Sequence, residues 1–120
     1  MTKDQNSKQY DLEERTLNFT KEVIEFVKIL PRTTANAEIT KQVIRSSGSI
    51  GANYIEANES LSKKDFIMRI KICRKESKES SYWLKLAEVK NSGGQNQRGV
   101  LIEESMQLTK IFSSIVEKSR

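Results

Sequence analysis

The chain of 120 residues contains no histidine, one cysteine (Cys73) and one proline (Pro31). Without histidine it lacks the most common general base, the most common zinc ligand and the side chain that titrates near neutral pH. A single cysteine allows neither an intramolecular disulfide nor a thiolate metal cage, and it is typical of a reducing compartment. These absences predict a protein that is not an enzyme and holds no metal or other cofactor.

The sequence also lacks the run of about 18 apolar residues that a membrane-spanning helix requires. Its first six residues, Met1 to Asn6, contain no apolar stretch of the kind found in secretory signals. We therefore expect a cytoplasmic protein that does not contact a membrane.

Hydrophobic residues make up 36% of the chain and charged residues 31%, with a net charge of +5 and a pI ≈ 9.4. The apolar fraction is lower, and the charged fraction higher, than in an average globular domain. The apolar residues nevertheless recur at helical spacing, which indicates folded amphipathic helices rather than disorder. A pI above about 9 permits an anionic partner such as nucleic acid, although it does not require one.

Helical periodicity predicts one domain of four helices behind a short polar tail. Residues 1–10 have no periodicity and predict a disordered tail, while residues 11–120 form the domain. No stretch alternates with the period of a strand, and the connections are short, so the fold class is all-α, an antiparallel up-down-up-down four-helix bundle. We expect the first three helices at residues 11–30, 35–58 and 63–90. A glycine-rich loop is expected at residues 91–99 and the last helix at residues 100–120.

Each expected helix has an apolar side that repeats every three or four residues, and such sides pack together in a bundle core. Charged and polar side chains occupy the remaining faces. The side chains expected at the core or its edges are Leu12, Phe19, Val23, Phe26, Leu30, Ile39, Val43, Ile50, Tyr54, Ile55, Ala57, Phe66, Ile70, Ile72, Cys73, Ser77, Trp83, Leu84, Ala87, Leu101, Leu108, Ile111, Phe112 and Ile115.

The middle of the second expected helix, residues 46–52, consists almost wholly of glycine, serine and alanine. A glycine inside a helix costs about 1 kcal/mol relative to alanine, so Gly48 and Gly51 require tight packing in compensation. Small side chains let another helix approach closely, and the segment therefore predicts a close contact and, with it, self-association. The run Gly48-Ser49-Ile50-Gly51 also matches the GxxG loop of KH nucleic-acid-binding domains, but that loop needs flanking strands, which are not predicted here.

A polar stripe borders the apolar side of the same helix and contains Gln42, Arg45, Ser49, Asn53 and Glu56. On the third helix Glu76 lies beside the inward side, where a carboxylate needs a cation or several donors to offset its lost hydration. We expect an ion pair between Arg45 and either Glu76 or Glu56. A paired-carboxylate acid/base site is the functional alternative, but no nucleophile or metal-ligand set accompanies it.

The third expected helix carries a row of basic residues with one aromatic residue among them. We call these six side chains the basic row: Lys71, Arg74, Lys75, Lys78, Tyr82 and Lys85. Cations beside an aromatic ring are what a phosphate backbone with an unstacked base requires. An ordinary solvated helix face is an equally good explanation for a single chain, and Glu79 weakens the positive field. Assembly of several copies would strengthen that field.

The sequence resembles a known family at two places. Residues 42–57 are similar to the motif Q-x-x-R-x-x-x-S-I-x-x-N-x-x-E-[GA] of the four-helix-bundle proteins encoded in 23S ribosomal RNA intervening sequences, whose older label is ribosomal protein. Downstream, residues 64–66 and residues 75–84 resemble the third-helix pattern of one branch of the family. The similarity extends over residues 12–117, with Ala57 where many members have glycine.

The resemblance implies an antiparallel bundle that assembles into a homopentameric barrel, and it implies no enzymatic activity. Related proteins include the accessory variability proteins of diversity-generating retroelements, which are basic pentamers that associate with RNA, DNA and a reverse transcriptase. The matched signature positions are Arg45, Asn53, Glu56, Glu76 and Tyr82. Taken together, the residues expected to serve structure or subunit contacts are Gln42, Arg45, Gly48, Ser49, Gly51, Asn53, Glu56, Glu76 and Trp83.

Two functions fit these observations. The first is an oligomeric, non-enzymatic bundle whose basic row binds RNA or DNA phosphates. The second is a protein-interaction scaffold that recruits a partner protein and does not bind nucleic acid. Charge and periodicity do not decide between them, because both need only an exposed charged helix.

Overall fold

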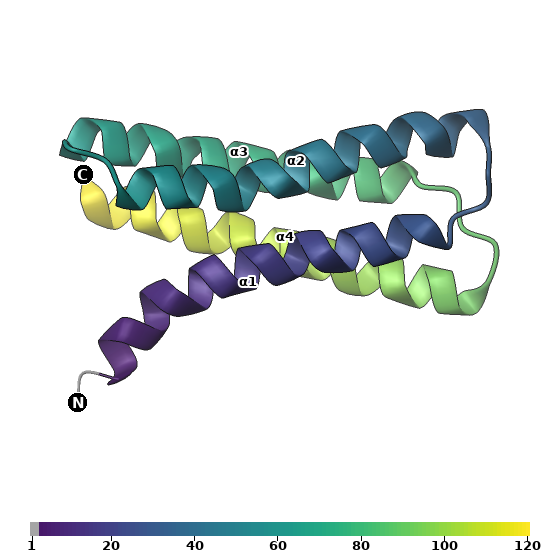
Figure 1. The fold of residues 1–120 in the computed structure, drawn as a ribbon, viewed down its shortest axis with the longest axis horizontal. Helices are drawn as coiled ribbons and strands as arrows, with labels where there is room; N and C mark the ends of the chain where they lie inside the picture. Colours follow the sequence, from purple (N-terminus) through teal and green to yellow (C-terminus); the bar gives the residue numbers. More distant parts are fainter. Residues whose placement is uncertain (1–2) are drawn as a thin grey trace.

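The protein consists of four helices connected by short segments, as the sequence predicts. The computed structural model describes the backbone of residues 3–120 and the side chains of residues 12–120. The helices are α1 (Lys3–Lys28), α2 (Thr34–Asn58), α3 (Lys63–Leu86) and α4 (Ser92–Ser119). Consecutive helices run in opposite directions, so that α1 begins and α4 ends at the same end of the bundle (Figure 1). Within this part of the chain α1 contacts α2 and α4 but not α3, which places α1 and α3 on a diagonal.

The predicted tail at residues 1–10 stays a prediction. Residues 1–2 lie outside the described part of the chain, and the side chains of residues 3–11 lie outside it as well. For residues 3–11 only the helical backbone of α1 is described.

The starts of three helices are set by polar side chains that accept hydrogen bonds from free backbone amides. Thr33 accepts from the amide of Asn36 at 3.0 Å, and Ser62 accepts from that of Asp65 at 3.1 Å. Asn91 accepts from the amide of Gly94 at 2.7 Å. Such caps satisfy donors that the first helical turn leaves without partners. Pro31 lies between α1 and α2, where its missing amide donor is harmless.

The prediction for residues 87–99 is wrong in two respects. The third helix ends at Leu86 rather than at residue 90, and the expected glycine-rich loop at residues 91–99 belongs to α4 from Ser92 onward. Buried Asn36 explains the first error: its amide donates to the carbonyl of Glu88 at 3.0 Å and accepts from the amide of Glu88 at 2.9 Å. These two bonds hold the chain extended after α3, and the cap at Asn91 then starts α4 although three glycines follow.

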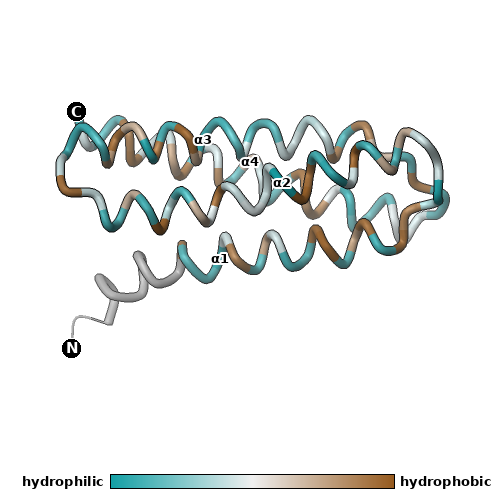
Figure 2. Tube along the Cα trace, turned by 45° about the horizontal axis from the view of Figure 1, so that its top comes forward, coloured by the Kyte–Doolittle hydropathy of each residue, from teal (hydrophilic) through white to brown (hydrophobic). Residues whose placement is uncertain are grey.

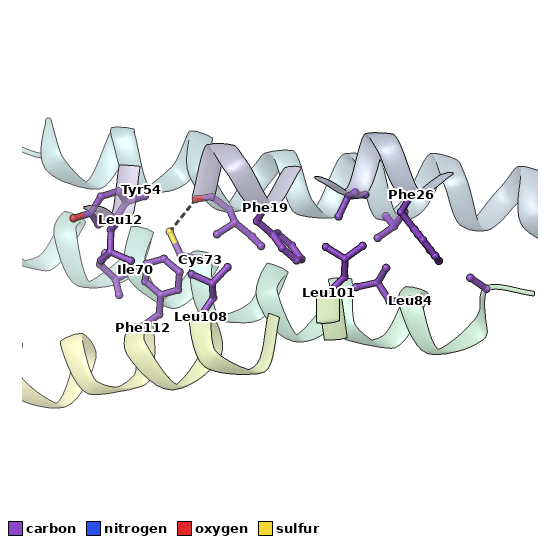
Figure 3. Packing of buried hydrophobic residues seen from close by; sticks show 14 of the residues in the cluster. Leu12, Phe19, Phe26, Tyr54, Ile70, Cys73, Leu84, Leu101, Leu108 and Phe112 are labelled. Atoms are coloured by element: carbon purple, nitrogen blue, oxygen red, sulfur yellow. Dashed lines mark hydrogen bonds between the residues drawn. The ribbon is translucent and has the colours of Figure 1, made fainter. Parts of the chain in front are cut away.

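The core consists of the apolar sides that the sequence predicts. Brown, apolar stretches recur between teal and white ones along the coloured parts of the helices (Figure 2). Figure 3 shows the inward side chains meeting between the helices. Ile55 is the one clear error, because its side chain is 52% exposed. The largest fully buried side chains are Phe19, Phe26, Phe112, Ile50, Ile70, Leu84, Leu101, Leu108, Val23, Val43 and Val116.

The small-residue segment of α2 makes the predicted close contacts, and it makes them inside the chain. The hydroxyl groups of Ser46 and Ser80 lie 2.8 Å apart between α2 and α3. On the other side, Thr20 of α1 donates to the carbonyl of Ser47 at 2.9 Å. A Cβ atom on Gly51 would meet the Thr16 hydroxyl oxygen at 3.1 Å, so glycine at position 51 permits the approach of α1.

Gly48 differs from Gly51, because a Cβ atom at Gly48 would meet no atom within 4 Å. Replacing Gly48 by alanine should therefore raise the free energy of unfolding by up to about 1 kcal/mol, the difference in helix propensity. The Gly51→Ala variant gains the same helix propensity, but its new methyl group overpacks against stiff, buried Thr16. Its free energy of unfolding should therefore be about 1 kcal/mol lower than that of the wild type. Urea denaturation measures both variants. Equal stability of the two would contradict the assigned contact, and adding Thr16→Ala should rescue Gly51→Ala.

Candidate nucleic-acid interface

The net positive charge of the chain is concentrated on one helix. Of the 24 residues of α3, eight are basic and three are acidic, which gives a net charge of +5. The whole chain also has a net charge of +5. The charges outside α3 therefore cancel, and the positive field of the protein originates from this helix.

Five of the six members of the basic row are exposed, and Arg74 is half-buried. Lys71 and Lys85, its ends, lie about 21 Å apart at the helical rise of 1.5 Å per residue. Among the described residues, no carboxylate forms an ion pair with any of the five cations. The row is therefore free to contact an anionic partner.

Arg45 of α2 pairs with the two glutamates of α3 that lie next to the basic row. Its guanidinium is 3.5 Å from the buried carboxylate of Glu76 and also forms an ion pair with Glu79. The predicted Arg45–Glu76 pair is thus present. The alternative partner, Glu56, is exposed and forms no ion pair in the described part of the chain. The expectation that Glu79 weakens the field stays a prediction, because Arg45 offsets only one of the two carboxylate charges and the charge of Lys75 still acts on Glu79.

Glu79 is held on two sides. The indole N–H group of Trp83 donates to its Oε2 atom at 3.0 Å, and Arg45 donates from α2. The Trp83 hydrogen bond, followed by those of Arg45, lowers the pKa of Glu79 below its usual range. Trp83 is half-buried, and its ring meets the ring of Tyr82 edge-on, with centroids 5.2 Å apart and an interplanar angle of 74°. Tyr82 itself is 58% exposed.

The other motif residues of α2 make structural bonds. The amide group of Asn53 donates to the carbonyl and the hydroxyl oxygen of Ser49, each at 2.9 Å. Arg69 of α3 donates to the Oδ1 atom of Asn53 at 2.9 Å, so this network joins α2 to α3. Gln42 donates to Glu38 one turn earlier at 2.9 Å. Sequence pattern does not single out Arg69, since its charge suits the exposed face equally well.

A groove of ≈ 940 Å³ lies between α1 and α4, away from the basic row, and sequence reasoning missed it. Arg15 and Glu104 form a two-bond ion pair in its wall, with distances of 2.7 and 2.9 Å. The remaining charged residues that line it are Glu14, Glu22 and Glu103. Its net negative charge repels phosphate, so this groove is not a nucleic-acid site.

The single cysteine of the chain is a poor candidate for a nucleophile. Cys73 is buried, its thiol donates to the Ile50 carbonyl at 3.4 Å (Figure 3), and burial raises its pKa to about 12. At neutral pH the thiol is therefore protonated and a poor nucleophile. The described residues contain no group of three His, Cys, Asp or Glu side chains placed to hold a metal ion. None of the helices they form is long and apolar enough to cross a membrane.

The fold and this surface define a class: a four-helix bundle with one cationic helix face. The chain belongs to the family described as 23S rRNA-intervening sequence protein, to which residues 8–114 match. This confirms the resemblance found in the sequence.

A similar solved structure is the crystal structure of a protein of unknown function from the S23 ribosomal protein family of Bacteroides thetaiotaomicron. The two sequences are 29% identical, the TM-score is 0.74, and the alignment covers 88% of this chain and 97% of that one. No curated protein matches the chain.

The ion pair at Glu79 should make stability depend on acid pH. At pH 7, Glu79→Gln should lower the free energy of unfolding by about 1 kcal/mol, because the pair with Arg45 is lost while the new amide still accepts from Trp83. A carboxyl group whose pKa is lower in the folded chain stabilises the fold above its unfolded pKa, and this contribution disappears as pH falls through the folded value.

The difference between the wild type and Glu79→Gln should therefore shrink below about pH 4.3, the ordinary pKa of glutamate. Urea denaturation at several pH values measures it. The control is Glu22→Gln on α1, since Glu22 is exposed and forms no ion pair among the described residues. A Glu79→Gln deficit that is the same at pH 3 and pH 7 would contradict the assignment.

Proposed function

We propose that the protein is a non-enzymatic, cytoplasmic, oligomeric bundle that binds RNA or DNA phosphates through the basic row. The observation that carries the proposal is the placement of the entire net charge on α3, with five cations that form no ion pair among the described residues. The family description names an intervening sequence of 23S rRNA, which makes structured RNA the first ligand to test.

Arg45 supports this function from behind the row. Without it, Glu76 and Glu79 would place two negative charges beside Lys75 and Lys78 and reduce the attraction for phosphate. Because Arg45 comes from α2, the outer face of α3 can carry lysines at nearly every turn. Lysine and arginine contacts to phosphate release condensed counterions, so binding through this row depends strongly on salt.

We propose that the oligomer is a homopentameric barrel, in line with the family resemblance. Two apolar residues on the outer side of α1, Leu17 and Ile24, are 53% and 36% exposed. Thr20 lies between Leu17 and Ile24 on α1 and bonds to Ser47 of α2, so Gly48 lies beside this turn of α1. Gly48 has open space where a side chain would be, so a neighbouring copy can approach there. Five copies of the chain would multiply the field of α3.

The acidic groove between α1 and α4 favours a second candidate function, a scaffold for a partner protein. Glu14, Glu22 and Glu103 line it, and Val100 at its wall is 55% exposed. This combination suits a cationic segment with an apolar side chain. Loss of partner binding after charge reversal in the groove, with nucleic-acid binding unchanged, would support this function.

Neutralising Lys71, Lys75 and Lys78 together to glutamine should weaken the binding of structured RNA roughly 100-fold at about 0.1 M salt. The slope of log K against log salt should also become shallower by about 2–3, because each phosphate contact contributes about 0.7–0.9. Filter binding at two salt concentrations measures both effects. The matched control neutralises Lys21, Lys41 and Lys118, which are exposed and outside the row. Equal losses in the two triple variants, or RNA binding that is absent or insensitive to salt, would contradict the proposal.

The variant Gly48→Leu tests the assembly separately from folding. The added side chain meets no atom of its own chain near the Cβ position, so the thermal unfolding of the subunit should change little. It should instead block the approach of a second copy and shift sedimentation towards smaller species. Gly51→Leu is the contrasting variant, since it overpacks against Thr16 and should unfold the subunit. A Gly48→Leu protein that sediments like the wild type would place the subunit contact elsewhere.

A further inference from the structure

We propose that the basic row selects single-stranded over double-stranded nucleic acid, with Tyr82 as the surface on which one unpaired base stacks. The inference rests on the proposed function, because it specifies which nucleic acid the row binds. Its new element is the aromatic ring, which a purely electrostatic surface would not need.

The orientation of Tyr82 is supported from behind by a chain of contacts. The ring of Trp83 meets that of Tyr82 edge-on with centroids 5.2 Å apart. Trp83 is fixed by its bond to Glu79 at 3.0 Å, and Glu79 is fixed by Arg45 of α2. A ring held in this way loses little conformational freedom when a ligand stacks on it.

The outward part of the Tyr82 ring is available to a ligand. The residue is 58% exposed although an aromatic side chain gains free energy when it is buried. Within the described part of the chain its one ring contact is with Trp83, and the rest of the ring faces outward. Tyr54 offers a contrast, because it is 4% exposed and packs against Phe112 in the core.

Cations lie one helical turn from Tyr82 in both directions. Lys78 precedes it by four residues and Lys85 follows by three, and residues at these spacings are neighbours on a helix surface. A base stacked on Tyr82 would therefore bring the phosphates on either side of it towards these two lysines. Basic grooves that alternate with aromatic rings bind single strands in this manner, with little preference for base identity.

A duplex cannot use the ring in the same way. Its bases are paired and stacked, and exposing one requires breaking those contacts. A duplex would therefore contact only the cations of the row, whereas a single strand gains the stacking contact in addition. The structure thus predicts a preference for single strands that depends on Tyr82.

The test compares a labelled oligouridine, a labelled oligoadenosine and a blunt RNA duplex of equal length in fluorescence anisotropy at two salt concentrations. The wild type should bind both single strands more tightly than the duplex. Tyr82→Ala should weaken single-strand binding about 5- to 100-fold, the range found for base–aromatic stacking, with an unchanged salt slope. Duplex binding should not change, and Tyr82→Phe should retain single-strand binding because the ring remains.

Leu86→Ala is the matched control, since Leu86 is another exposed apolar residue of α3, 47% exposed and one turn further along. It should leave the affinities for all three ligands unchanged. Trp83, the single tryptophan of the chain, gives a second readout, because a base on Tyr82 should alter its emission.

The outcomes separate the two proposals. Salt-dependent binding in which Tyr82→Ala has no effect, or weakens single strand and duplex equally, overturns the stacking role while the phosphate-binding function stands. Tighter binding of the duplex by the wild type also overturns it. If no nucleic acid binds in a salt-dependent manner, both proposals fail.

Discussion

The contact on which the surface of this protein depends is the one between Arg45 and two glutamates of α3. Glu76 is buried, and a buried carboxylate without a cation would strongly destabilise the fold. Glu79 is partly exposed and holds Trp83 in place through its indole N–H group. A single guanidinium from α2 therefore joins two helices, pairs with two carboxylates and helps to fix an aromatic side chain. The neighbouring cations of the basic row form no ion pair with a carboxylate among the described residues.

The interior makes this contact possible because α2 lies close to its neighbours. Ser46 bonds to Ser80 of α3, and Gly51 leaves room for Thr16 of α1. Larger side chains at these positions would move α2 outward and increase the distance between Arg45 and the glutamates of α3. The small-residue segment thus sets the distance between α2 and α3, and this distance allows Arg45 to reach the two glutamates.

Charge is divided between the two sides of the bundle. The basic row covers the outer face of α3, whereas acidic residues line the groove between α1 and α4, and α1 lies diagonally opposite α3. An anion and a cationic segment would therefore approach different faces. The basic row and the groove, to which the two proposed functions are assigned, therefore lie on different faces of the bundle.

Residue periodicity and motif spacing are enough to predict the number of helices, most of the core and the family. Apolar residues at helical spacing have only one way to become buried together, so Phe19, Val43 and Leu108 could be placed without coordinates. Helix ends and side-chain contacts that involve residues distant in the sequence follow only from the packing of the helices. Local propensity predicted that α3 continues to residue 90, but Asn36, 52 residues away from Glu88, holds the chain extended after Leu86. The packing of the helices also brings Arg45 to Glu79 and the ring of Trp83 to that of Tyr82. A helical pattern predicts the face on which a residue lies but not the atoms that it contacts.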